Sequence, residues 1–221
     1  MTEYRELKQA IIDACLKLEA RGDIIGTYGN ASARVPGGLI VTPSRVDYHE
    51  ITPDDMVTVA DDGSVIDGHR LPSSETSVHR MIYLARPDVG AVLHTHSFYA
   101  TALSCLHETV PVIVEEQSQV VGDALCCTSY IPAGQHLRLG AEVARALGGS
   151  NGVLLANHGV VACGRTMDEA LFVTQVVERV CHMWLMTRPG AIPIPDEYVR
   201  SERERWLYKY GTAADNTAAT K

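Results

Sequence analysis

Hydrophobic residues recur along the chain with two different spacings, which separate expected helices from expected strands. Between residues 3 and 21, apolar side chains stand three and four positions apart, and Gly22 follows as a stop signal. A helix after Glu75 is predicted by Val78, Met81 and Ile82. The same spacing predicts helices over 97–106, 136–147 and 167–187 and a short helix around 196–209.

Shorter apolar runs, bounded by Gly, Pro, Asn and Asp, predict strands. Helices interspersed among such strands and hairpins are typical of a layered α/β domain. The predicted strands are Ala31–Val35, Leu39–Thr42, Met56–Ala60, Gly90–Leu93, Val110–Val114, Ala124–Tyr130, Gly152–Ala156 and Val160–Cys163.

Length and charge narrow the class of protein. A chain of 221 residues fits one domain with a sizeable core. The formal net charge of −8 argues against a nucleic-acid partner, whose binding surface would be basic. We also expect no membrane partner, because no apolar run approaches the roughly 18 residues that a spanning helix needs.

The cysteines and the first residues indicate the compartment. The six cysteines are scattered and contain no C-x-x-C pair, which is consistent with free thiols. The chain starts with the charged segment MTEYRELK, which does not look like a signal peptide. We therefore expect a cytoplasmic protein in a reducing environment.

Two histidine motifs are candidates for a metal site. His94 and His96 follow a predicted apolar strand, where residues two apart point to the same face and their imidazoles can share a cation. His158 lies between two predicted strands and precedes Gly159. Either motif alone is also compatible with ordinary surface or core histidines. Together they offer three nitrogen ligands and an open position, the pattern of a catalytic zinc.

Two polar segments are candidates for binding an anion. Ser73-Ser74-Glu75 leads into a predicted helix, with Ser74 expected as its N-cap, and hydroxyls and free amides at a helix start attract anions. Glu75 fits either a stabiliser of the first helical turn or a site carboxylate. In the loop from Gly26 to Asn30, two glycines let the backbone approach a ligand.

These motifs, in this order, resemble the class II aldolase/adducin-like family of the fuculose-phosphate aldolase and ribulose-phosphate 4-epimerase type. The resemblance covers roughly residues 5–187. It rests on Gly26-Thr-Tyr-Gly-Asn-Ala-Ser32, Leu39-Ile-Val-Thr-Pro-Ser44, Pro72-Ser-Ser-Glu75, His94-Thr-His96 and Asn157-His-Gly159.

The resemblance implies an architecture. We expect a three-layer α/β/α single domain with a central mixed, largely antiparallel sheet over residues 1–210, and a disordered tail over 211–221. The family implies a homotetramer whose sites form between subunits.

The resemblance also implies residue roles in a lyase reaction. A small ketose phosphate would be cleaved to dihydroxyacetone phosphate and an aldehyde. His94, His96 and His158 would bind Zn²⁺, with Mn²⁺ or another divalent metal as alternatives, and Glu75 would be the catalytic acid and base. Substrate binding falls to Thr27, Asn30, Ser44, Ser73 and Ser74.

Three features bear on which branch of the family the chain resembles. Arg45 stands where phosphate-binding members usually have glycine, and it could bind a phosphate or carboxylate or fill the phosphate's space. Glu115 aligns with a tyrosine that the fuculose-type enzyme supplies from a neighbouring subunit. Glu75 favours the lyase branch, since the epimerase branch has aspartate there.

Other readings stay open on the sequence alone. Arg45 could hold the carboxylate of a substrate for decarboxylation, so the substrate is a sugar phosphate or a related acid. Glu115 or Glu116 could serve a dehydratase, and a non-catalytic adducin-like module is the alternative from another class. His79 shares a helix face with Glu75; we expect a packed histidine rather than support for the site.

Overall fold

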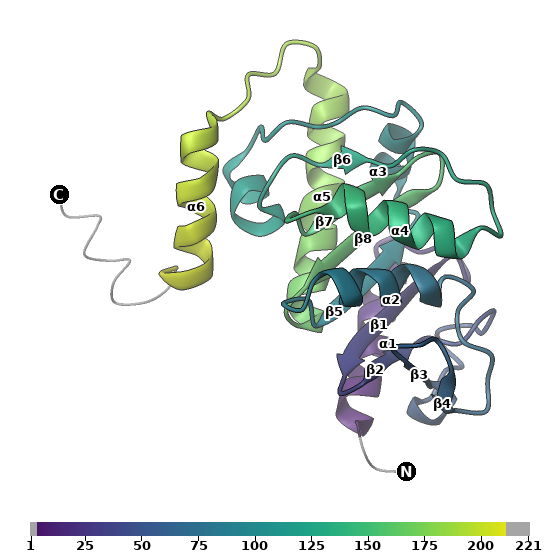
Figure 1. Cartoon of the computed structure of the whole chain (residues 1–221). Helices are drawn as coiled ribbons and strands as arrows, with labels where there is room; N and C mark the ends of the chain where they lie inside the picture. Colours follow the sequence, from purple (N-terminus) through teal and green to yellow (C-terminus); the bar gives the residue numbers. More distant parts are fainter. Residues whose placement is uncertain (1–3, 211–221) are drawn as a thin grey trace.

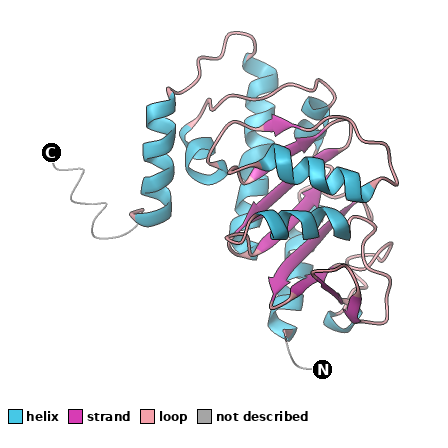
Figure 2. Cartoon of the chain, viewed as in Figure 1, coloured by secondary structure: helices cyan, strands magenta, loops and turns pink. Residues whose placement is uncertain are grey.

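The computed structural model describes residues 4–210, and within these residues eight strands form one sheet. The strand order across the sheet is 4-3-2-1-5-8-7-6, and only the last pair is parallel. Figure 2 shows the strands as one twisted layer between helices. The strands are β1 (Gly29–Val35), β2 (Gly38–Val41), β3 (Val57–Ala60), β4 (Val65–Asp67), β5 (Ala91–Thr95), β6 (Cys126–Cys127), β7 (Gly152–Leu155) and β8 (Gly159–Gly164).

Helices cover both faces of this sheet, so the described residues form three layers. Helices α2 and α4 lie side by side on one face, in front of the sheet in Figure 1, while α1, α3 and α5 lie behind it. The helices are α1 (Arg5–Ala20), α2 (Thr76–Ala85), α3 (Phe98–Ser104), α4 (His136–Leu147), α5 (Met167–Thr187) and α6 (Asp196–Tyr208), with a 3₁₀ turn η1 (Pro53–Asp55) and a π-helical segment η2 (Gln117–Val121). The predicted α/β fold with a mixed, largely antiparallel sheet is confirmed.

Alternation along the central strands sorts side chains between the two cores. On β5, Val92 packs with Val78 and Ile82 of α2, whereas its neighbour Leu93 packs with Ile11 of α1 on the other face. All five of these side chains are almost fully buried. Since His94 has the same parity as Val92, its side chain continues the face that α2 covers.

The strand register brings distant segments to one end of the sheet. Strand β5 pairs with β1 on one side, where His94 stands opposite Asn30, and with β8 on the other, where Thr95 stands opposite Val160. The turn that joins β7 to β8 contains His158 and lies at the same end. Antiparallel pairing therefore gathers the glycine-rich loop, the two histidines after β5 and the β7–β8 turn.

The two strands predicted between residues 110 and 130 are largely wrong. Val110 makes only an isolated bridge to Leu125, and of the range 124–130 only Cys126–Cys127 joins the sheet. Pro111 lacks the backbone N–H that a ladder requires, which explains why this valine-rich run does not form a strand. The π-helical η2 follows it and was not predicted.

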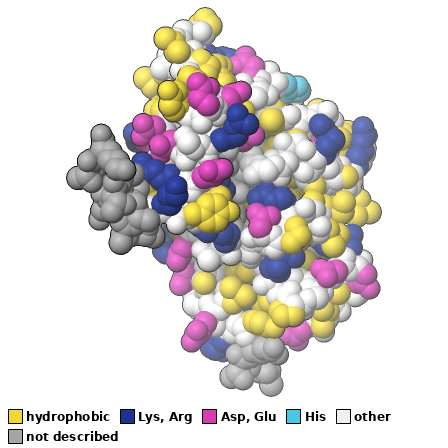
Figure 3. Space-filling view, turned by 60° about the vertical axis from the view of Figure 1, so that its left-hand side comes forward, with side chains coloured by type: hydrophobic (Ala, Val, Ile, Leu, Met, Phe, Trp, Pro, Cys, Tyr) yellow, Lys and Arg dark blue, Asp and Glu magenta, His cyan; other side chains and the backbone are white. Residues whose placement is uncertain are grey.

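Helix α6 packs against η2 and bears many charged residues. Arg203 donates hydrogen bonds to the carbonyl oxygens of Gln119 (2.6 Å) and Val120 (3.0 Å), and Gln119 donates to Glu202. Figure 3, which turns this side of the molecule forward, shows acidic and basic side chains interspersed rather than gathered by sign. The tail predicted over 211–221 lies outside the described residues.

The first testable consequence of the fold concerns Gly159, the first residue of β8. A Cβ at this position would collide with the carbonyl oxygen of Thr95 on β5 and lie 3.4 Å from Cε1 of His94. We expect Gly159→Ala to push β8 away from β5 and to destabilise the protein by about 1–3 kcal/mol, the usual cost of overpacking. Denaturant unfolding measures the change.

Gly149 provides the matched control, because a Cβ there would have no neighbour within 4 Å. Gly149→Ala should leave the free energy of unfolding within about 0.5 kcal/mol of the wild type. Equal stability of the two variants would contradict the close approach of β8 to β5.

Candidate active site

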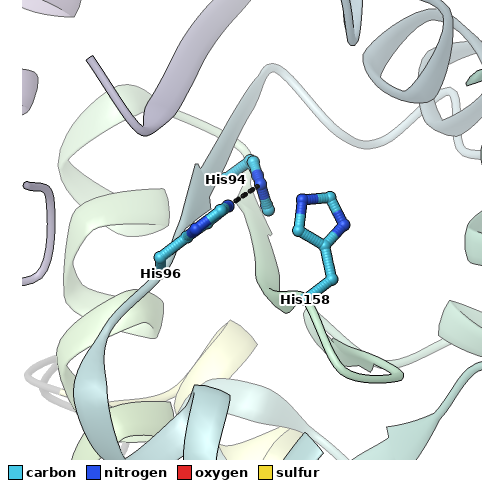
Figure 4. A group of neighbouring side chains, drawn as sticks. All are labelled: His94, His96 and His158. Atoms are coloured by element: carbon cyan, nitrogen blue, oxygen red, sulfur yellow. Dashed lines mark hydrogen bonds between the residues drawn. The ribbon is translucent and has the colours of Figure 1, made fainter. Parts of the chain in front are cut away.

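Three histidine rings converge at the end of the sheet where β5 ends. Their centroids lie 4.8–4.9 Å apart in edge-on pairs, and Nε2 of His94 is 3.1 Å from Nε2 of His96. Figure 4 shows the rings of His94, His96 and His158 turned toward one another. His96 lies just beyond the strand rather than within it, yet its ring still meets that of His94.

The hydrogen bonds of the cluster fit a bound cation. Nδ1 of His94 lies 3.0 Å from the carbonyl oxygen of Val160, so this nitrogen donates and Nε2 presents its lone pair to the cluster. Burial, then the neighbouring histidines, lowers the pKa of His96 and of His158 to about 4, which keeps both rings neutral. A tetrahedral zinc separates two ligand nitrogens by roughly 3.3 Å, close to the spacing here.

Glu75 completes the cluster with a carboxylate. Its Oε2 lies 3.2 Å from Nε2 of His94, and its Oε1 lies 3.5 Å from Nε2 of His158. Burial raises the pKa of Glu75, but His94, His158 and a hydrogen bond from Asn30 outweigh burial and hold this pKa at about 2. The carboxylate oxygens of Glu75 and the ring nitrogens of the three histidines surround one small space, where a single cation would satisfy them together, so the residues fit a metal ion.

The prediction that Ser74 caps α2 is wrong, because the cap position belongs to Glu75. The Glu75 side chain makes no capping hydrogen bond there, and its own N–H is 3.3 Å from Oγ of Ser73. Since the side chain does not serve the helix, it is available to the histidine cluster.

A pocket of about 490 Å³ opens in front of the cluster. Glu75, His96 and His158 line it, whereas His94 is only 2% exposed and lies behind them. Every residue predicted to bind substrate also lines this pocket: Thr27, Asn30, Ser44, Arg45, Ser73 and Ser74.

Two backbone segments bring the predicted anion-binding residues together. The N–H of Ser44 donates to the carbonyl oxygen of Leu71 (2.9 Å), and that of Ser73 donates to Thr42 (3.0 Å). The threonine-proline loop and the double-serine segment are thereby joined side by side. Ser44, Ser73 and Ser74 of these two segments line one wall of the pocket.

Arg45 has an unusual backbone conformation in this wall. Its φ is 59°, in the left-handed region that favours glycine. Its side chain is exposed at the pocket. A strained residue at a site entrance suggests that the side chain itself is needed there.

Glu115 lies apart from the pocket of its own chain. It precedes η2, its side chain is exposed, and its carbonyl oxygen accepts a hydrogen bond from Ser118. The chain by itself therefore gives Glu115 no contact with the histidine cluster.

Sequence reasoning missed two parts of the site. One is the wall formed by the segment from Tyr130 to Ala133 together with His136 and Leu139, which carries no motif. The other is His79, which is fully buried as expected of a packed histidine but also contacts Asn30. Its place one helical turn after Glu75 was the signal.

Comparison with known proteins agrees with the fold. Residues 9–185 match the family described as Class II Aldolase and Adducin N-terminal domain. The chain is 35% identical to the L-fuculose phosphate aldolase of Haemophilus influenzae, over 86% of this chain and 87% of the relative. It is 34% identical to a 5-methylthioribulose-1-phosphate/5-deoxyribulose-1-phosphate aldolase of Rhodospirillum rubrum, over 95% and 93%.

An epimerase and a solved aldolase structure also match. An L-ribulose-5-phosphate 4-epimerase of Salmonella paratyphi A is 31% identical, over 95% of this chain and 97% of the relative. A solved structure of L-fuculose 1-phosphate aldolase superposes with a TM-score of 0.87 at 31% identity, over 92% of this chain and 97% of that one. The chain belongs to the class II aldolase and adducin family.

Among the described residues, no helix is both long enough and apolar enough to cross a membrane.

The histidine cluster generates a prediction about metal content. Purified protein should hold about one divalent ion per chain, measured by elemental analysis. We expect the double variant His94→Ala/His96→Ala to lose that ion while keeping its fold, because two of the three nitrogen ligands are gone. His69→Ala is the control, since this exposed histidine pairs with Asp55 far from the pocket. Undiminished metal in the double variant would refute the site.

Proposed function

We propose that the chain is a metal-dependent aldolase that cleaves a small ketose phosphate to dihydroxyacetone phosphate and an aldehyde. One observation carries this proposal: the carboxylate of Glu75 converges with the imidazole rings of His94, His96 and His158 beside a pocket that serine and threonine residues line. The similarity to L-fuculose phosphate aldolase and to 5-methylthioribulose-1-phosphate/5-deoxyribulose-1-phosphate aldolase supports it. A non-catalytic module has no need of this arrangement.

His94, His96 and His158 would hold the metal, with zinc as the proposed ion and manganese or another divalent ion as alternatives. When bound there, such an ion supplies Lewis acidity for negative charge that develops on substrate oxygens. The three rings are fixed before binding, because the carbonyl oxygen of Val160 orients His94 and the neighbouring rings pack edge to edge.

Glu75 would move the proton. It takes the proton of the hydroxyl group beside the carbon–carbon bond that breaks, and the hydroxyl carbon becomes the aldehyde. The bond's electron pair moves toward the ketone, and the same carboxyl group returns the proton to the carbon left behind. Atoms and electrons balance without a further reactant.

The hydroxyl wall would bind the phosphate. Thr27, Ser44, Ser73 and Ser74 present polar groups to the pocket on the side of the double-serine segment. A phosphate held there supplies binding energy at a distance from the reacting atoms.

Arg45 favours one second candidate, a decarboxylase of a related acid. A guanidinium group recognises a carboxylate as well as a phosphate with two parallel hydrogen bonds. Arg45 has a left-handed backbone conformation, which favours glycine, so the arginine side chain is kept at a position where it is unfavourable for the backbone.

We further propose that the protein is a homotetramer with sites shared between subunits. Exposed apolar side chains occur close in sequence to the site: Ile25 and Tyr28 precede β1 and Phe98 follows His96 by two residues, with exposed fractions of 67%, 67% and 72%. Tyr28 leans on the ring of His96, at 5.6 Å between centroids. A neighbouring subunit packed against these segments would cover these side chains and could present its Glu115.

The proposed compartment is the cytoplasm. All six cysteines are free, and three of them are buried, which suits a reducing environment.

The test of the proposed function is Glu75→Gln, which keeps the size of the side chain but cannot exchange a proton. We expect kcat for ketose-phosphate cleavage to fall by roughly 10²–10⁴-fold. Melting temperature and tetrameric mass should be unchanged, because the Glu75 side chain does not cap α2.

Glu169→Gln is the control for losing a carboxylate at a helix start, since Glu169 lies in the first turn of α5 and binds Arg165 outside the pocket. It should keep full turnover. A metal-loaded, folded Glu75→Gln protein with near-normal kcat would sink the proposed mechanism.

A separate prediction concerns Arg45. If its guanidinium binds the substrate's anionic group, Arg45→Ala and Arg45→Gly should both raise KM by roughly 10–100-fold, the effect of losing a charge-assisted hydrogen bond, and change kcat far less. Arg45→Gly should also stabilise the fold relative to Arg45→Ala, because glycine relieves the left-handed φ. Steady-state kinetics on phosphate and carboxylate substrates give the readout, and an unchanged KM for both would remove Arg45 from the site.

A further inference from the structure

A network of hydrogen-bonded, buried polar side chains lies behind Glu75, between α2 and β1. His79 and Tyr83 stand four residues apart on one face of α2, and Asn30 and Ser32 stand two residues apart on one face of β1. All four are at most 6% exposed. The helical and strand periods match here, so each helix residue meets a strand residue.

Glu75 determines which groups donate and which accept in this network. An ionised carboxylate only accepts, so Nδ2 of Asn30 donates to Oε2 of Glu75 at 2.8 Å. The amide oxygen of Asn30 then faces Nε2 of His79 at 2.5 Å, and His79 must be the donor. The orientation of the Asn30 amide is thereby fixed by partners at both ends.

Ser32 and Tyr83, at the other end of the network from Glu75, complete the hydrogen bonding of His79. With the proton on Nε2, Nδ1 of His79 accepts from the hydroxyl of Ser32 at 2.6 Å. Ser32 Oγ in turn lies 2.8 Å from the hydroxyl of Tyr83. Burial, and then His94, lower the pKa of His79 to about 3 against the effect of Glu75, which agrees with a neutral ring.

The next residue along this face anchors the seam between helix and strand. Arg34, two residues beyond Ser32 on β1, donates to the carbonyl oxygens of Tyr83 (2.7 Å) and Arg86 (2.8 Å). Its guanidinium also lies over the Tyr83 ring, at 4.7 Å from the centroid. The position of α2 relative to β1 is therefore held by side chains along the whole seam.

Reversing the Asn30 amide would be costly at the Glu75 end. The amide oxygen would then face the ionised carboxylate at hydrogen-bond distance, so two acceptors would meet where water is scarce and unmatched polar groups cost most. The reversed amide would also require His79 to carry its proton on Nδ1, so the orientation of the amide and the tautomer of His79 are set together.

We propose that His79 is a positioning residue of the reaction: by donating from Nε2 to Asn30 it holds the Asn30 amide so that its NH₂ group fixes the Glu75 carboxylate against the histidine cluster. This inference rests on the proposed acid and base role of Glu75. It also gives the Asn30 side chain a role besides lining the pocket, since its amide joins His79 to Glu75.

The kinetic test compares two substitutions of His79. His79→Leu removes the donor, so kcat should fall by about 10–100-fold, the usual effect of misplacing a catalytic group, while KM and metal content stay within about twofold. His79→Gln can place an amide N–H near the position of Nε2 and should recover most of the lost kcat. Two variants equally impaired, or a His79→Leu kcat within twofold of wild type, would overturn the proposal.

A matched control separates positioning from loss of stability. Asn151, also buried and hydrogen-bonded, precedes β7 at the end of the strand remote from His158. Asn151→Leu should lower the melting temperature as His79→Leu does but leave kcat unchanged. An equal fall of kcat in both variants would show a merely structural role and overturn the proposal.

A spectroscopic test does not depend on the substrate. Nitrogen-15 NMR of protein labelled in its imidazoles, with His79→Gln used for assignment, should find His79 neutral with its proton on Nε2. A proton on Nδ1, or a charged ring at pH 7, would overturn the positioning role. If the wild type cleaves no ketose phosphate, the proposed function fails, and the NMR result still decides the hydrogen-bond arrangement.

Discussion

The Glu75 carboxylate is buried beside three imidazole rings, and the electrostatic cost of that burial governs the arrangement around it. A carboxylate in this position needs compensating charge or hydrogen bonds. Asn30 supplies one hydrogen bond, and the imidazole lone pairs call for a cation that also satisfies the carboxylate. The same side chains thus meet the needs of stability and of chemistry.

The central strands make this arrangement rigid. Strand β5 has a partner on each side, so His94 is set by two ladders at once, one to β1 and one to β8. Asn30 reaches the carboxylate because β1 places it directly opposite His94. A site built on the middle of a sheet is held more exactly than one built on loops, where the substrate-facing residues Ser44 and Arg45 lie.

Much of the fold and the histidine cluster could be predicted because their signals are local. The spacing of His94 and His96, and the position of Glu75 before an amphipathic helix, are visible in short windows of sequence. The strand β4 gave no such signal, because Val65, Ile66 and Asp67 are all exposed and no buried face shapes their pattern. The contact of His79 with Asn30 depends on how α2 lies over β1, which no short window contains.

The two edge strands of the sheet limit how copies of this chain can associate. The edge strands are short, with three residues in β4 and two in β6. Such edges offer few unpaired backbone groups, which protects a protein against adding a foreign strand. Growth of the sheet from one chain into the next is therefore disfavoured, and an assembly of copies would rest on side chains of helices and loops, where geometry can limit it to a fixed number of subunits.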